Sequence, residues 1–186
     1  VAIASPESLI ECASANEFTI PLTNNNGATY YKISFSAGSF TALTEWTAIP
    51  TTGISILLNG TPAGTYNATL TVTDATKTFA LTINALPEIN LGTISNLAYN
   101  ATSVTIPYTV PSGSTAKTYV ATIDGVSGGS ATGDVNVLGG NIVINGFSSL
   151  IPGAHNISVV VTSDKGCTDT FTQSFLVVAE QGITPS

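Results

Sequence analysis

Residues 64–74 read GTYNATLTVTD, and apolar and polar side chains alternate along the whole stretch. Tyr66, Ala68, Leu70 and Val72 would share one face of a strand, while threonine and asparagine would share the other. A period of two is typical of a strand that has one face in a hydrophobic core and the other in water. This stretch therefore predicts a central, half-buried β-strand.

The same pattern returns 89 positions later, where residues 153–164 read GAHNISVVVTSD. His155, Ile157, Val159 and Val161 take the inward positions of this second strand. Shorter repeats accompany it, since VTIPY follows FTIPL and IVING follows ILLNG at an offset of 86. The chain therefore contains two copies of one β unit, each about the size of a small sandwich domain.

Turn signals recur every eight to twelve residues, which is the pattern of an immunoglobulin-like sandwich. We expect an all-β protein with two tandem immunoglobulin-like β-sandwich domains of about seven strands each, arranged end to end. The expected boundaries are residues 1–85 for the first domain and 86–180 for the second. Residues 181–186 would form a tail or the start of the next linker.

Two segments fit the alternation less well. Residues 39–50 place apolar side chains at helix-like spacing among threonines, so we expect an irregular strand or one helical turn. Residues 125–133 are rich in glycine and nearly without apolar anchors, which predicts a mobile loop. Tyr66 and His155 stand where such sandwiches place a corner side chain that bonds back to the loop before its strand.

The composition excludes some functions and favours an extracellular setting. The net charge is −7, from 11 acidic and 4 basic residues, so no face could neutralise a run of phosphates, and nucleic acid is excluded as a partner. Charged residues make up only 8% of the chain, and threonine, serine, asparagine and glycine fill the surface instead. No apolar run is long enough for a spanning helix. We expect a fragment of a longer, exported protein without a membrane span of its own.

The stretch 62–74 (PAGTYNATLTVTD), together with 31–35 (YKISF) and 163–168 (SDKGCT), resembles a known type of repeat. Similar motifs occur in the polycystic-kidney-disease-like and immunoglobulin-like repeats of large surface proteins, adhesins included, of gliding bacteria of the Bacteroidetes type. Residues 33–38 read ISFSAG where the kidney-disease type has Trp-x-Phe-Gly-Asp-Gly. The resemblance implies a modular ectodomain at the cell surface or outside the cell. It would serve in an adhesin or as a spacer beside a secreted enzyme, with neighbouring domains, extracellular glycans or other surface proteins as partners.

The residues favour a non-catalytic role, with no catalytic, cofactor-binding or metal-binding residues expected. His155 is the single histidine and has no recognisable nucleophile to activate. Four acids of the second unit lie in or beside turns, where aspartate commonly bonds the local backbone: Asp124, Asp134, Asp164 and Asp169. A calcium ion at the junction would depend on Asp74, Glu88 and Asp164, although no Asp-x-Asp-x-Asp run exists. We expect the chain not to be an enzyme.

Carbohydrate binding is the alternative function, as an accessory module of a secreted hydrolase. It would need exposed aromatic side chains, and Trp46, Tyr30 and Tyr99 are candidates because each falls outside the inward register of its neighbours. Trp46 could equally cap the core. The sequence leaves both roles open.

Cys12 and Cys167 are the two cysteines of the chain and fall in different units. In an immunoglobulin-like topology, the turn after the first strand of one unit and the last hairpin of the next unit would face the same junction. We therefore expect an interdomain disulfide that closes about 155 residues, which in the loop-entropy model stabilises the fold by roughly 5 kcal/mol. The alternative is two thiols that are free or paired with external partners.

Overall fold

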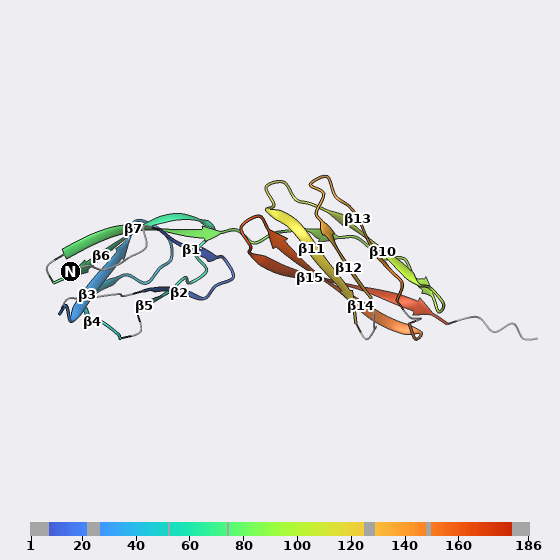
Figure 1. Ribbon diagram of the computed structural model, residues 1–186, viewed down its shortest axis with the longest axis horizontal. Coiled ribbons are helices and arrows are strands. Elements are labelled where there is room, and N and C mark those ends of the chain that lie inside the picture. Colours follow the sequence, from blue (N-terminus) through green and yellow to red (C-terminus); the bar gives the residue numbers. More distant parts are fainter. Residues whose placement is uncertain are drawn as a thin grey trace, which may run out of the picture. The chain divides into compact units, whose positions relative to one another are not determined.

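The structure, a computed structural model, describes residues 8–21, 27–51, 53–73, 75–124, 129–147 and 150–179. The chain divides into two units, Val1–Ala85 and Leu86–Ser186. Each unit has its own hydrophobic core. All regular elements of the described residues are strands (Figure 1). Within this part of the chain, no helix has the length and apolar character needed to cross a bilayer. The expected tail, residues 181–186, lies outside the described residues.

The first unit is built from two sheets. Five strands form the larger sheet, in the order β1 (Ser8–Cys12), β7 (Ala75–Asn84), β6 (Gly64–Val72), β3 (Tyr30–Phe35) and β4 (Leu43–Ala48). The smaller sheet pairs β2 (Glu17–Ile20) with β5 (Ile54–Leu57). Inward residues of both sheets belong to one core cluster, which includes Phe18 and Ile54 of the smaller sheet and Leu70 of the larger one. This is a two-layer sandwich.

The second unit repeats this plan. Its larger sheet has the order β12 (Ser130–Asp134), β11 (Ala116–Ile123), β14 (Gly153–Ser163), β15 (Thr168–Val178) and β9 (Leu97–Ala98). Its smaller sheet has the order β13 (Gly140–Asn145), β10 (Ser103–Thr109) and β8 (Asn90–Leu91). In both larger sheets, the strand that comes first in the chain runs parallel to the strand that comes last. These pairs are β1 with β7 and β9 with β15. The fold is all-β, with tandem immunoglobulin-like β-sandwich domains.

The predicted inward register is confirmed in both central strands. On β6, Ala68, Leu70 and Val72 are buried, whereas Thr65 and Asn67 are exposed. On β14, the inward side chains are Ile157, Val159 and Val161, and each has no exposed surface. The period of two in the sequence therefore describes the buried face of each central strand correctly.

The two irregular segments differ in outcome. Residues 43–48 form β4, so the strand alternative is confirmed and the helical turn is wrong; its pairing with β3 shifts register between Tyr31 and Ile33. The mobile loop expected for residues 125–133 is wrong from Ser130 onward, because β12 pairs there with β11. The hydrogen bonds of a strand pair need no apolar anchor, which is why the sequence pattern missed it. Residues 125–128 lie outside the described residues.

Gly133 shows why this strand contains a glycine. It lies opposite Tyr119 on β11, and a Cβ atom at this position would be 2.8 Å from the Tyr119 hydroxyl oxygen. The absence of a side chain lets the Tyr119 ring lie across the neighbouring strand. An aromatic ring that covers a strand glycine stabilises the pair.

Replacing Leu70 by alanine should lower the free energy of unfolding by about 2–5 kcal/mol, because it leaves a cavity at a position with no exposed surface. Thr71→Ala is the matched control, since Thr71 is half-buried on the opposite face, and it should cost less than about 1 kcal/mol. Urea unfolding of the first unit, followed by the fluorescence of the single tryptophan, measures both. A larger loss for Thr71→Ala would contradict the register.

Candidate functional site

An exposed aromatic pair lies on the outer face of the larger sheet of the first unit. Tyr30 is on β3 and Trp46 is on β4, and these antiparallel strands place Tyr30 opposite Ala48. The side chains are 51% and 46% exposed, and together with Thr73 they line a cavity of about 320 Å³. Trp46 therefore does not cap the core. Two of the three aromatic residues proposed from the sequence are brought together.

Lys32 completes this group, although the sequence pattern did not predict it. It follows Tyr30 by two residues on β3, so both side chains point to the same face of the sheet. Its Nζ atom lies 4.8 Å from the centroid of the Trp46 ring, in the range of a cation–π interaction. Among the described residues, Lys32 forms no ion pair. The i, i+2 spacing from Tyr30 was a signal that could have found it.

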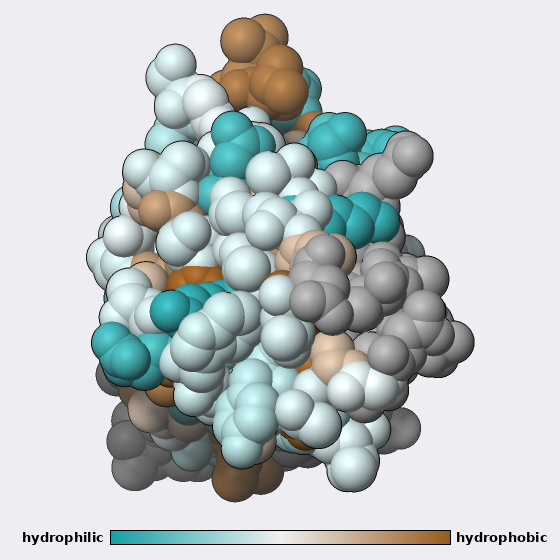
Figure 2. All heavy atoms as spheres, turned by 90° about the vertical axis from the view of Figure 1, so that its left-hand side faces the viewer, coloured by the Kyte–Doolittle hydropathy of each residue, from teal (hydrophilic) through white to brown (hydrophobic). Residues whose placement is uncertain are grey.

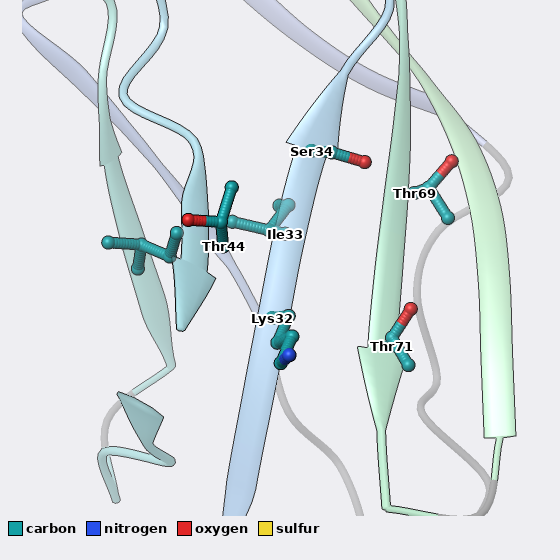
Figure 3. A pocket seen from close by; sticks show the side chains of 7 residues that line it. Lys32, Ile33, Ser34, Thr44, Thr69 and Thr71 are labelled. Carbon is teal, nitrogen blue, oxygen red and sulfur yellow. The ribbon is translucent and has the colours of Figure 1, made fainter. Parts of the chain in front are cut away.

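A second, more polar cavity of about 240 Å³ adjoins Lys32 on the same sheet. Lys32 is paired with Thr71 of β6, and Ser34 is paired with Thr69 (Figure 3). These neighbours give the cavity a lining rich in hydroxyl groups. The face seen in Figure 2 is mostly of near-neutral hydropathy, with scattered hydrophilic residues and a few hydrophobic ones, in keeping with the low content of charged residues. We name Tyr30, Lys32 and Trp46 the aromatic–lysine site.

Tyr99, the third aromatic candidate, belongs to the second unit. It lies in the turn after β9 and is 44% exposed. It lines a different cavity, of about 170 Å³, with Ala98, Asn100, Val178 and Ala179. No second aromatic ring lines that cavity among the described residues. Tyr99 is therefore an isolated exposed aromatic residue, unlike Tyr30 and Trp46.

Both cysteines are disulfide-bonded, so the alternative of free thiols is wrong. Cys12 is the last residue of β1, opposite Asn84, the last residue of β7. Directly after it, the Ala13 amide donates a hydrogen bond of 2.9 Å to the Asn84 carbonyl oxygen. Cys12 therefore lies at the end of the first unit from which the chain continues toward the second.

Cys167 lies in the hairpin between β14 and β15 and is almost fully buried. Its amide donates a hydrogen bond of 3.0 Å to Ser163 Oγ. The Asp164 amide of this hairpin donates to the Thr115 carbonyl oxygen at 3.2 Å. The neighbouring Ser114 hydroxyl in turn donates to the Glu88 carbonyl oxygen at 2.7 Å. Cys167 therefore lies at the end of the second unit where the chain enters it.

The corner residues behave as the sequence predicted. The Tyr66 hydroxyl donates a hydrogen bond of 2.8 Å to the Pro62 carbonyl oxygen. His155 Nε2 lies 2.9 Å from the Ile151 carbonyl oxygen, at the same separation of four residues. His155 Nδ1 also lies 3.5 Å from Asp124 Oδ1, which accepts the Asn156 amide at 2.9 Å. The histidine thus ties a strand to the preceding loop, which is a structural role.

The remaining titratable groups offer no catalytic arrangement within the described residues. Asp169, the second residue of β15, accepts the Thr170 amide at 2.7 Å, and Asp164, in the hairpin before β15, lies 3.5 Å from Lys165, so both have local partners in or beside a turn. Three or more potential metal ligands do not gather anywhere in the described ranges. Asp74, one of the acids considered for calcium, lies outside them. Burial raises the pKa of Tyr31, so its hydroxyl stays protonated at neutral pH and offers no base.

No family model matches the sequence, and no curated protein matches it. Among solved structures, the chain is similar to the fibronectin(III)-like modules of CbhA from Clostridium thermocellum, with 14% identity, a TM-score of 0.44, and coverage of 100% of this chain and 97% of that one. It is also similar to the BSP domain of a biofilm associated protein, with 17% identity, a TM-score of 0.33, and coverage of 94% and 29%. A third similar structure is that of the FN1–FN3 domains of chicken CNTN1, with 11% identity, a TM-score of 0.44, and coverage of 94% and 69%. At these identities the likenesses concern the fold alone, and function depends on the residues of this chain.

Replacing His155 by phenylalanine should destabilise the second unit by about 0.5–1.5 kcal/mol, because the hydrogen bond to the Ile151 carbonyl oxygen is lost. His155→Tyr should recover most of this loss, since Tyr66 makes the equivalent bond in the first unit. Urea unfolding followed by circular dichroism compares the two variants. Equal stability of the phenylalanine and tyrosine variants would show that the corner bond contributes nothing.

Proposed function

We propose that the chain is a non-catalytic structural module, in which two immunoglobulin-like repeats act as a spacer within a larger cell-surface or secreted protein. The residues that could have supported catalysis have structural roles instead. His155 bonds a loop, and Asp124 and Asp169 accept backbone amides. Two well-packed cores joined by a short connection are what a spacer requires.

The observation that carries this proposal is the disulfide-bonded state of Cys12 and Cys167. We propose that the two pair with each other, because the sequence contains no third cysteine. Each lies at the end of its own unit that adjoins the connecting segment. Residues 85–87 join Asn84 to Glu88, and this connection spans at most about 14 Å when fully extended. A short connection favours pairing between cysteines placed at its two ends.

A structural disulfide also supports the proposed setting. Such bonds persist in oxidising surroundings, outside the cell or in an exported compartment. The resemblance to repeats in surface proteins of gliding bacteria agrees with this setting. We propose that the parent protein is an adhesin or a protein of gliding motility. In such a protein, the partners of these repeats would be the neighbouring domains of the same polypeptide.

A second candidate function is carbohydrate binding by the first unit, as an accessory module of a secreted hydrolase. The adjacency of Tyr30 and Trp46 on one exposed sheet face favours it. Exposed aromatic faces can pack against the apolar face of a sugar ring, while neighbouring hydroxyl groups bond its rim. The two functions are compatible, because carbohydrate binding would depend on Tyr30 and Trp46, whereas the role as a spacer depends on the two cysteines.

Peptide mapping tests the proposed pairing. Trypsin cleaves after Lys32 and Lys165, so Cys12 and Cys167 fall in separate peptides of this chain. Digestion without reductant should give one species that contains both peptides, and reduction should separate them. Mixed disulfides with external thiols, or dimers linked through Cys12, would contradict the proposal. Cys12→Ser/Cys167→Ser provides the control that cannot form the bond.

A further inference from the structure

The aromatic–lysine site contains a positive charge without a carboxylate partner in the described structure. The chain has four basic residues, all lysines, against 11 acidic ones. Lys165, in contrast, has its Nζ atom 3.5 Å from Asp164 Oδ2. Lys32 instead places its Nζ over the Trp46 ring, beside an open apolar cavity. A cation held on an aromatic platform, in an otherwise acidic protein, indicates a ligand that brings the negative charge.

We propose that the aromatic–lysine site binds a glycan that contains uronic acid. The pyranose ring would pack against the exposed faces of Tyr30 and Trp46, and its carboxylate would pair with the Lys32 ammonium group. This inference rests on the second candidate function, carbohydrate binding, and not on the role as a spacer. It narrows the ligand from glycans in general to those with a carboxylate.

The neighbouring cavity supports an extended ligand. Ser34, Thr69 and Thr71 line it next to Lys32, and their hydroxyl groups both donate and accept hydrogen bonds (Figure 3). When one sugar ring is bound at the aromatic pair, the next ring of the glycan would therefore lie at this cavity, where its hydroxyl groups can form hydrogen bonds. Apolar side chains of a peptide would offer these hydroxyl groups no hydrogen bonds, whereas each ring of a glycan carries several hydroxyl groups that can bond them, which favours a glycan on this face.

Charge selects among glycans. A neutral sugar gains nothing from the Lys32 charge, whereas a carboxylate gains an exposed ion pair. The net charge of −7 opposes the approach of an anion, but it is screened beyond roughly 8 Å at physiological salt, so the local cation decides. Affinity for an acidic glycan should consequently fall as the salt concentration rises.

Trp46 is the single tryptophan of the chain, so its fluorescence reports directly on this site. The probes are oligogalacturonate and oligomannuronate, with methyl-esterified oligogalacturonate and cellotriose as neutral comparisons. The two uronates should shift the Trp46 emission in a saturable way. The neutral methyl ester should bind about two- to fivefold more weakly than its parent acid, as expected for loss of one exposed ion pair.

Variants separate the contributions of the three side chains. Lys32→Met should remove the preference for the acid over the ester, and Tyr30→Ala should weaken both. Trp46→Ala should abolish binding. Calorimetry measures this, because the variant has no tryptophan fluorescence. The matched controls are Tyr99→Ala, an equally exposed aromatic residue, and Lys165→Met; neither should change the affinity.

Each outcome has a definite meaning. Preference for uronates that depends on Lys32 supports the inference. Equal binding of acid and ester, or selectivity that survives Lys32→Met, overturns the inference but leaves carbohydrate binding in place. An absence of binding to every glycan overturns both. Self-association that disappears in Trp46→Ala, measured by light scattering, would instead identify the face as an interface between copies and overturn the inference.

Discussion

Burial of one face of each central strand is the constraint on which both units depend. Leu70 on β6 and Val159 on β14 have no exposed surface, and the strands on either side place their own inward residues in the same core. The outward residues do not have to be apolar and are mostly threonine, serine and asparagine. These uncharged polar side chains fit a pleated surface that faces water. That polar outer face, with Tyr30, Lys32 and Trp46 on it, is where the first unit can acquire a function beyond its fold.

Much of the fold could be predicted from the sequence because the period of two and the internal repeat are strong signals. They identified the buried faces of β6 and β14, and the corner hydrogen bonds of Tyr66 and His155 followed from their positions in the repeat. The signals failed at β12, where Ala131 is the one hydrophobic residue packed against the core and the sequence SATGD has no apolar alternation to mark a strand. They also could not show that Tyr30 and Trp46 are neighbours, because this depends on the irregular pairing of β3 with β4. The position of Lys32 over the Trp46 ring depends on the same pairing.

The proposed pairing of Cys12 with Cys167 has a mechanical consequence that follows from covalent connectivity alone. Tension applied to the two ends of the chain would pass from residue 12 to residue 167 through the disulfide. Residues 13–166, which include most of both cores, would then carry no load. Without the bond, tension would act on the hydrogen bonds and packing of each sandwich in turn. A spacer with this bond would resist extension even where its individual domains are only marginally stable.

Single-molecule pulling on the ends of the chain tests the central claim, a tandem of two separately folded units closed by one disulfide. In the oxidised protein we expect no unfolding step of the length of a unit. After reduction, or in Cys12→Ser/Cys167→Ser, two steps should appear, each of roughly 25 nm for about 85 residues of released chain. Two steps of this length in the oxidised protein would contradict the account.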